Sequence, residues 1–246
     1  MWLFLVIKQL LSGVGLAASR RKGHKILTLV LSLSILGCSE YKTRPADTAR
    51  ITLPASQGAY GEWETLGYYP GTKVPDFTLY AADGKPFHLY EELDKGKALV
   101  LINGSYTCDI SRGKLSSIKD ISNRYDDRVK VVMVYTIDAH PSDTLSPYAT
   151  NTNKWIPKNN IRDHISAAQP RTYGERVALS NAWIRENQLS MPVLIDEPNN
   201  EYWMEFGQAP NMCYIIDPDG VVRYRRTWYD EKYLDNEIQQ MTELSE

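Results

Sequence analysis

Cys108 stands in the segment GSYTCD (residues 104–109), where an apolar run gives way to an amphipathic pattern. A cysteine at a helix N-terminus faces unpaired backbone amides and the positive end of the helix dipole, which favour its thiolate. A thiolate attacks peroxides, disulfides or halogens far better than a thiol does. We therefore predict that Cys108 is a redox-active nucleophile whose pKa falls below the free value of about 8.5.

Two hydroxyl residues close to Cys108 are expected to support it. Ser105, three residues earlier, can offer its hydroxyl to the sulfur or to the substrate, and Thr107 can cap the helix. The carboxylate of Asp109 opposes a thiolate, but we expect it to be solvated and turned away. The alternative for Cys108 is a structural role, because free cysteine is among the most buried residue types.

His140 lies in the segment DAHPSD (residues 138–143), which directly follows a second apolar run. The C-terminal ends of neighbouring parallel strands lie side by side, so we expect His140 to emerge near Cys108. A histidine there can act as an acid or base near neutral pH, with Asp138 or Asp143 orienting it. The alternative is a solvated loop histidine.

Pro210 precedes the last expected strand, where a cis peptide bond would shape the rim of the site. Cys213 follows about 10 Å along that strand. We interpret Cys213 as core packing, with a resolving thiol as the alternative. Three cysteines cannot form a four-cysteine zinc site, and no HExxH, phosphate-binding glycine loop or nucleophile-elbow serine is present. We therefore expect no metal and no cofactor.

The remaining patterns predict the elements that position these residues. Apolar runs predict buried strands at 97–105, 129–137 and 191–196. Helices are predicted at 108–125, 172–189, 198–207 and 229–244, and hairpins at 75–90 and 211–226. Residues 140–170 are too long and irregular for a plain connection. This order predicts an α/β, thioredoxin-like fold: a mixed central sheet flanked by helices, with an N-terminal β-hairpin and one insertion.

Composition and charge indicate the class of protein and exclude some partners. Its 246 residues are 43% hydrophobic and 24% charged, an ordinary globular balance. The net charge of −2 presents no basic footprint, so we expect no nucleic-acid partner. We predict an export segment over 1–38, a polar tether with scattered Pro and Gly over 39–72, and the thioredoxin-like domain over 73–246.

Residues 19–38 are typical of a signal peptide. A basic stretch precedes the apolar run 26–36, which is too short to span a bilayer and fits a secretory h-region. The segment ILGC, which ends at Cys38, resembles a bacterial lipobox, in which the cysteine is lipidated. We predict a lipoprotein, exported and lipid-anchored to a bacterial membrane, facing the periplasm or the cell exterior, where thiols can be oxidised.

Other interpretations of the N-terminus remain open. The apolar run can instead be an uncleaved anchor or a core helix. The pair Arg20-Arg21 is similar to a twin-arginine signal, so the export route is undecided. Residues 1–18 are also apolar, and they are either a second anchor or the product of an upstream misread start.

The two motifs together resemble the iodothyronine deiodinase family, within the thioredoxin-like and peroxiredoxin-like redoxins. In that family one strand ends in Gly-Ser-Cys-Thr-Sec and another in Glu-Ala-His-Pro-Ser-Asp, which GSYTC (104–108) and DAHPSD (138–143) match closely. The resemblance covers roughly residues 72–230. It implies a cysteine-containing, deiodinase-like oxidoreductase, a reductive dehalogenase or a peroxidase.

The chain departs from the family pattern at several positions. Cys108 replaces selenocysteine, and a thiolate is the weaker nucleophile. Four further positions differ: Tyr106 replaces a cysteine, Ile137 a glutamate, Leu145 a tryptophan, and Asn159 or Asn160 a histidine. The peroxide-activating arginine that peroxiredoxins carry near Asn211 or Met212 is also absent. The scaffold and the thiol are kept, whereas the thyroid-hormone clamp is not.

These observations lead to one predicted function and two alternatives. Cys108 is expected to attack a small-molecule or disulfide substrate, and an external thiol or a protein reductase then restores it. The first alternative is a lipid-anchored binding or scaffold domain without turnover. The second is a disulfide carrier that pairs Cys108 with Cys213.

Overall fold

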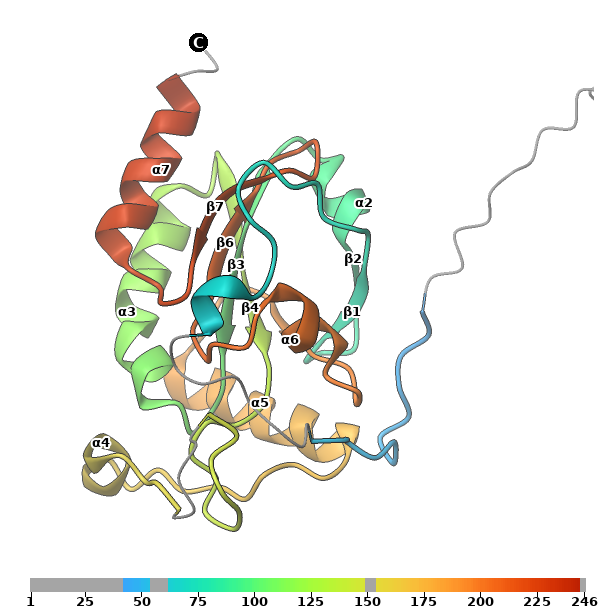
Figure 1. Ribbon diagram of the computed structural model, residues 1–246, viewed down its shortest axis with the longest axis vertical. Coiled ribbons are helices and arrows are strands. Elements are labelled where there is room, and N and C mark those ends of the chain that lie inside the picture. Colours follow the sequence, from blue (N-terminus) through green and yellow to red (C-terminus); the bar gives the residue numbers. More distant parts are fainter. Residues whose placement is uncertain (1–41, 54–61, 149–153, 244–246) are drawn as a thin grey trace, which may run out of the picture. The chain divides into compact units, whose positions relative to one another are not determined.

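A mixed β-sheet forms the centre of the molecule in the computed structural model, which describes residues 42–53, 62–148 and 154–243 (Figure 1). Over these residues the sheet has seven strands in the order β2-β1-β5-β4-β3-β6-β7. Their bounds are β1 Thr78–Ala81, β2 Pro86–His88, β3 Ala98–Gly104, β4 Val129–Tyr135, β5 Val193–Ile195, β6 Cys213–Ile216 and β7 Val222–Arg226.

The two central strands, β3 and β4, are parallel and in full register. Ala98 pairs with Val129 at one end, and Gly104 pairs with Tyr135 at the other. Both strands therefore end at the same level, and the loops that follow them meet at one edge of the sheet. β5 continues the parallel part beside β4, whereas β1, β2, β6 and β7 pair antiparallel.

Helices cover both faces of the sheet, which is why β3 is buried along its whole length. One face carries α3 Asp109–Arg124, α5 Tyr173–Asn187 and α7 Glu231–Glu243. The other carries the 3-10 helix η2 Trp63–Thr65, α2 Leu89–Leu93 and α6 Glu201–Phe206. Figure 1 shows α3 and α7 side by side on one side of the sheet and α6 on the other.

Local sequence explains how the sheet edge that carries Cys108 is built. α3 buries Leu115, Ile118 and Ile121 at three-residue steps, which attaches the helix to the sheet. At the end of β3 only a glycine fits, because a Cβ on Gly104 would lie 2.6 Å from the ring of Trp183. The strand therefore ends against α5 just before the cysteine segment.

The predicted fold class is confirmed: this is a thioredoxin-like α/β fold with a mixed sheet between helices. The N-terminal hairpin and the C-terminal hairpin are present as β1–β2 and β6–β7. One detail differs, because the hairpin prediction extended to residue 90. β2 ends at His88, which is the N-cap position of α2, whose residues Leu89 and Leu93 are fully buried.

The expected tether differs from the structure in its described parts, because these are hydrogen-bonded to loops of the domain. Ile51 N–H donates to the carbonyl of Arg171, and Thr52 N–H donates to that of Pro198, both at 2.9 Å. Trp63 is buried in the apolar cluster beside the sheet. Residues 42–53 and 62–72 thus pack as parts of the domain, so its boundary lies before the predicted residue 73.

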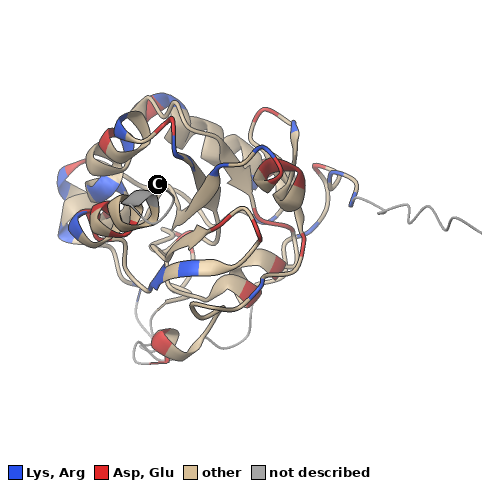
Figure 2. Cartoon of the chain, turned by 90° about the horizontal axis from the view of Figure 1, so that it is seen from above, with Lys and Arg blue, Asp and Glu red and all other residues tan. Residues whose placement is uncertain are grey.

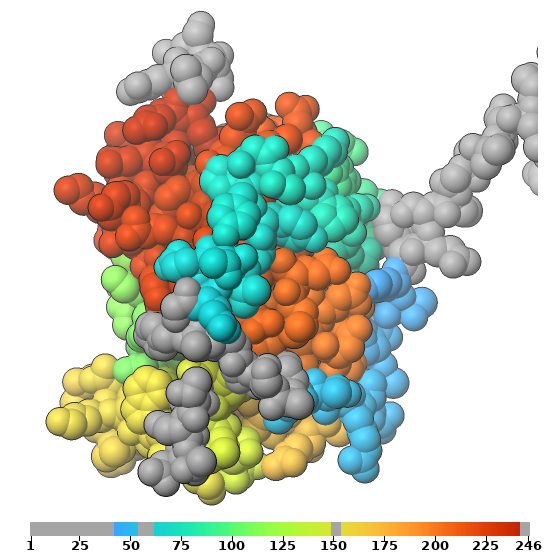
Figure 3. Space-filling view, viewed as in Figure 1, coloured from blue at the N-terminus to red at the C-terminus, as the bar shows by residue number. Residues whose placement is uncertain are grey.

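The predicted insertion contains one short helix, α4 Lys158–Arg162, and otherwise runs without regular structure over its described residues. In Figure 3 this insertion, in yellow, lies against the lower end of green α3. Figure 2 shows basic and acidic residues mixed over the helices of the molecule. Arg124 of α3, for example, pairs with Glu231 and Asp235 of α7.

Candidate functional site

Cys108 is the N-cap residue of α3, at the helix terminus that the sequence predicted. Its Sγ accepts a hydrogen bond from the backbone N–H of Ser111 at 3.4 Å. The side chain is only 1% exposed and packs in the apolar cluster on the α6 face of the sheet. Because Cys108 is itself the cap, the predicted capping role of Thr107 is wrong.

The Cys108 thiol differs electrostatically from the prediction. Burial raises its pKa above the ordinary value, although the hydrogen bonds from Ser111 act in the opposite direction. The charge of Asp109 raises this pKa further. The predicted low pKa is therefore wrong for this structure, because desolvation of the thiolate outweighs the amides of the helix terminus.

Ser105 connects the two loops at the sheet edge. Its hydroxyl oxygen accepts a hydrogen bond from the backbone N–H of Ala139 at 3.4 Å. Its carbonyl accepts from the hydroxyl of Ser111 at 3.4 Å. The predicted contact between the Ser105 hydroxyl and the sulfur is absent among the described hydrogen bonds, and Ser105 instead holds the histidine loop beside the cysteine loop.

Asp138 is a buried anchor for both loops. Its Oδ1 accepts from the backbone N–H and the hydroxyl of Thr107, at 2.9 and 2.8 Å, and its Oδ2 accepts from the Tyr135 hydroxyl at 2.6 Å. Burial nevertheless raises the pKa of Asp138 above its ordinary value, against these hydrogen bonds. The Asp138 carboxylate thus bonds to Thr107 and Tyr135 rather than to the imidazole of His140. The prediction that Asp138 orients His140 is therefore wrong.

Asp143 is also directed away from the imidazole. It accepts from the backbone N–H of Gln169 at 2.8 Å and pairs with Arg171 at 2.9 Å. Partial burial raises its pKa, but the Gln169 N–H and the Arg171 charge outweigh this, so the pKa of Asp143 lies below its ordinary value. Asp143 therefore fixes the far end of the insertion, and the second predicted partner of His140 is also corrected.

His140 is buried, with 5% of its surface exposed, rather than solvated. Its backbone N–H donates to the Thr107 hydroxyl at 3.0 Å, which places it beside the cysteine loop as predicted. Nδ1 lies 3.2 Å from the carbonyl of Trp155, and Nε2 lies 3.5 Å from Oδ1 of Asp109. Burial lowers the pKa of His140 below its ordinary value, and the charge of Asp109 offsets only part of this.

The insertion docks onto the cysteine loop through two asparagines that the sequence marked only as departures from a family pattern. Asn160 Nδ2 donates to the carbonyl of Thr107 at 2.8 Å, and Arg112 donates to Asn160 Oδ1 at 2.9 Å. Asn159 Nδ2 donates to Oδ2 of Asp109 at 3.2 Å. Asp109 is therefore paired on both oxygens, rather than solvated and turned away as predicted.

Tyr148 is a residue of the site region that sequence reasoning missed. It is buried in the same apolar cluster as Cys108. Its hydroxyl donates to the carbonyl of Ile137 at 3.2 Å and accepts from the indole N–H of Trp203 at 3.0 Å. Burial raises the pKa of this phenol, and the charge of Cys108 adds to the effect. Tyr148 thus anchors the insertion close to the thiol.

Pro210 lies in a segment that runs beside the end of β3. Asn211 Nδ2 donates to the carbonyl of Asn103 at 3.0 Å, and Asn103 Nδ2 donates to that of Ala209 at 3.4 Å. The bond before Pro210 is trans, as are all peptide bonds of the described residues, so the expected cis bond is not found. The segment is positioned instead by this pair of asparagines.

Cys213 lies on the opposite side of the sheet from Cys108. It belongs to the apolar cluster of the α3 and α7 face, whereas Cys108 belongs to that of the α6 face. Both are free cysteines, and burial raises the pKa of Cys213 well above its ordinary value. This arrangement agrees with Cys213 as core packing and leaves Cys108 without a resolving thiol among the described residues.

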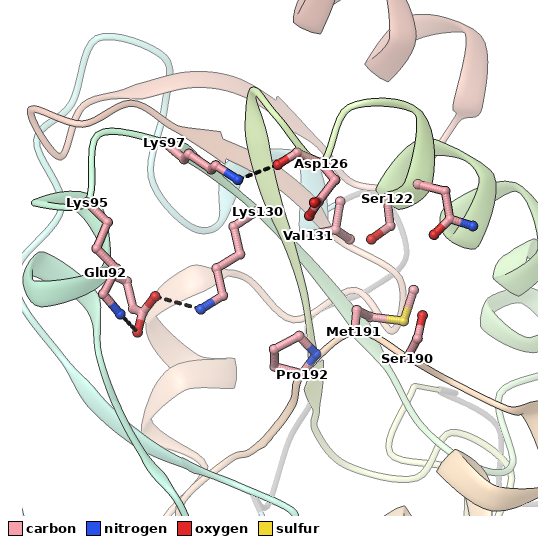
Figure 4. A pocket seen from close by; sticks show the side chains of 11 residues that line it. Glu92, Lys95, Lys97, Ser122, Asp126, Lys130, Val131, Ser190, Met191 and Pro192 are labelled. Atoms are coloured by element: carbon pink, nitrogen blue, oxygen red, sulfur yellow. Dashed lines mark hydrogen bonds and ion pairs between the residues drawn. The ribbon is translucent and has the colours of Figure 1, made fainter.

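A cavity of about 590 Å³ lies at the other end of the sheet (Figure 4). It opens where β3 and β4 begin, and Glu92 on its wall pairs with both Lys95 and Lys130. It contains none of the predicted site residues. Within the described ranges, no group of three His, Cys, Asp or Glu side chains could hold a metal ion.

The N-terminal predictions concern other residues. Cys38 and the export segment lie outside the described residues. Among the helices that the structure does describe, none is long and apolar enough to cross a membrane.

Comparison with known proteins gives consistent matches. A family model for the iodothyronine deiodinases matches residues 66–245. The type I iodothyronine deiodinase of Xenopus laevis is 24% identical over 157 residues, covering 64% of this chain and 56% of that protein. The thyroxine 5-deiodinase of Ovis aries is 24% identical over 212 residues, covering 76% of this chain and 66% of that protein. The chain thus spans less than two thirds of the length of either relative.

A solved structure is similar in outline. The thioredoxin domain of a thiol-disulfide oxidoreductase from Bacteroides vulgatus superimposes with a TM-score of 0.44 and 14% identity. The match covers 70% of this chain and 97% of that one.

Proposed function

Because the chain belongs to the iodothyronine deiodinase family, we propose that it is a thiol-dependent oxidoreductase with Cys108 as its nucleophile. The observation that carries the proposal is the position of Cys108 as N-cap of α3, beside the loop that holds His140. The substrate class is a peroxide, a disulfide or a halogenated compound. No metal or cofactor takes part in the proposed reaction.

The reaction is simplest to follow for a disulfide substrate. Sγ of Cys108 loses its proton to solvent, and the thiolate forms a bond to one sulfur of the substrate, while the other sulfur leaves with the bonding electrons. The leaving thiolate takes up a proton, for which His140 is the proposed donor. An external thiol then attacks the mixed disulfide, forms its own disulfide with the bound group and releases Cys108 as a thiol.

The external reductant follows from the position of the second cysteine. Cys213 packs on the other face of the sheet, so it cannot reach a bond formed at Cys108 while β6 stays in place. This arrangement supports a small thiol or a protein reductase as the partner, and it weighs against the disulfide-carrier alternative.

Replacing each cysteine separately tests the proposal. Cys108→Ser should abolish the thiol-dependent reduction of hydrogen peroxide, of a small disulfide or of an aryl halide with dithiothreitol as reductant. Cys213→Ser is the matched control, because it removes an equally buried sulfur and should keep the activity. Activity that survives Cys108→Ser would contradict the proposal.

A binding or scaffold domain without turnover is the second candidate, and one observation favours it. The Cys108 side chain is almost fully buried and its pKa is raised, which disfavours the reactive thiolate. Alkylation of the folded protein discriminates between the two candidates. In an enzyme, Cys108 is alkylated on the timescale of turnover. In a scaffold domain, it is alkylated only as fast as the domain unfolds.

We further propose that the domain is exported and attached to a bacterial membrane by a lipid on Cys38. The support is the order of the basic stretch, the short apolar run and Gly37-Cys38 in residues 19–38. In an oxidising compartment a free, buried thiol such as Cys108 requires a reductant supplied from outside the chain.

A further inference from the structure

Asp109 occupies an unexpected place in the site. It is the first residue of α3 and directly follows the Cys108 cap. An acidic residue in the first helical turn usually stabilises the helix dipole from a solvated position. Here the carboxylate is only 17% exposed and both of its oxygens have partners: Oδ1 faces His140 Nε2 at 3.5 Å, and Oδ2 accepts from Asn159 at 3.2 Å.

Both nitrogens of the imidazole face acceptors. The Trp155 carbonyl, 3.2 Å from Nδ1, can only accept, so Nδ1 must carry a hydrogen to bond to it. The carboxylate of Asp109 stands at Nε2 and can also only accept when it is ionised. The pair of acceptors is therefore satisfied fully only by the imidazolium, although burial opposes the charge.

From this arrangement we infer that Asp109 is a positioning residue, which counteracts the burial of His140 and lets it carry a proton at Nε2, on the loop that is bonded to the cysteine loop. The inference rests on the proposed function and names the group that prepares its proton donor. Asn159 fixes the carboxylate, and the Trp155 ring packs edge-on against the imidazole with centroids 4.5 Å apart.

The same carboxylate acts on the thiol with the opposite consequence. A negative charge beside Cys108 raises the cost of forming the thiolate. When His140 is protonated, the Asp109–His140 pair is neutral overall and this cost is reduced. Protonation of His140 thus favours both the attack by Cys108 and the proton delivery to the leaving group.

The other charged groups around the pair have defined partners. Arg112 of α3 lowers the pKa of His140. Its guanidinium donates to the carbonyl of Tyr106 at 3.2 Å and to Asn160 Oδ1, and lies 3.9 Å from Asp163. Near the thiol the titratable neighbour is Tyr148, whose phenol stays neutral because burial raises its pKa. Asp109 is therefore the group whose charge couples the two titrations.

The decisive variant is Asp109→Asn in the full chain. It keeps the shape of the side chain and removes the charge. The pKa of His140 should fall further, because its attracting charge is lost. The pKa of Cys108 should fall as well, because its repelling charge is lost. A purely helix-stabilising Asp109 would instead lower the unfolding midpoint and leave both titrations in place.

The His140 titration is measured by NMR on histidine-labelled protein, with the signal assigned from His140→Gln. Measuring it in a Cys108→Ser background makes it independent of any reaction at the thiol, so failure of the proposed function does not affect this arm. Asp120→Asn, an exposed aspartate on the same helix, is the matched control and should move neither titration. Asp109→Glu should restore the higher His140 pKa.

The Cys108 titration is measured from the pH dependence of alkylation by iodoacetamide. Below the thiol pKa, one unit of decrease raises the thiolate fraction tenfold, while the lower basicity weakens the nucleophile, so the rate rises about threefold. Asp109→Asn should therefore alkylate faster than the unaltered protein at pH 7. Unchanged midpoints for both groups in Asp109→Asn, or equal shifts in Asp120→Asn, would overturn the inference.

Discussion

Oδ1 of Asp138 accepts two hydrogen bonds from one residue, the backbone N–H of Thr107 at 2.9 Å and the Thr107 hydroxyl at 2.8 Å. The same hydroxyl accepts the backbone N–H of His140 at 3.0 Å. Gln169 closes the arrangement by bonding to both the N–H and the carbonyl of Asp138. A buried carboxylate thus holds the cysteine loop, the histidine loop and the end of the insertion together.

We expect Asp138→Ala to destabilise the fold by about 3 kcal/mol, because it leaves the hydroxyls of Thr107 and Tyr135 buried without an acceptor. Urea unfolding measures this loss. Asp143→Ala is the control, since its carboxylate is one-third exposed and its ion pair with Arg171 should contribute less than about 1 kcal/mol. Equal losses in the two variants would remove the anchoring role of Asp138.

The reactivity of Cys108 should continue to rise with pH above the free thiol value of about 8.5. Burial raises the pKa of this thiol, so the thiolate is a small fraction at pH 7 and grows as the pH approaches the raised pKa. Iodoacetamide alkylation, followed by mass spectrometry from pH 6 to 10, gives the profile. Cys213, which is fully buried at the start of β6, should react more slowly throughout. A plateau below pH 8.5 would show that the thiol ionises more easily than its burial permits.

His140→Ala should reduce turnover by roughly 10²-fold, the usual scale for a general acid or base. The reduction follows from loss of the proposed proton donor, so it should be largest where proton delivery to the leaving group limits the rate. Steady-state rates from pH 5 to 8 measure it. His164→Ala, an exposed histidine of the same insertion, should keep the rate. If both variants behave alike, His140 has no part in proton transfer.

Cys38→Ser should release the protein from membranes, because the predicted lipid is attached to this sulfur. The protein is followed by fractionation of membranes and by its mass before and after processing. Cys213→Ser should remain attached and serves as the control. A Cys38→Ser protein that still sediments with membranes, unprocessed, would identify residues 1–37 as an ordinary anchor.

Sequence pattern by itself determined the order of elements and the two segments that form the site edge. Apolar runs identified the strands that became β3 and β4, and three- and four-residue steps identified α3. These signals are local, because each residue's periodicity follows from the face that its own element buries. The parallel pairing then follows from chain order, and it brings Cys108 and His140 to one edge.

Only the tertiary structure decided which aspartate carboxylate lies beside the imidazole of His140. Sequence proximity favoured Asp138 and Asp143 as partners of His140, whereas the structure places Asp109 there. Such pairs join side chains about 30 residues apart, and their geometry depends on how the insertion docks through Asn160 on the Thr107 carbonyl. No local pattern encodes that contact.

The thiol pKa was decided in the same way. A helix N-terminus is visible in the sequence and favours the thiolate. The desolvation that opposes it comes from residues far apart along the chain, which pack together around Cys108 only in the folded domain. Solvent exclusion is a property of the whole packed structure, so the sequence predicted the position of the cysteine and the fold determined its electrostatics.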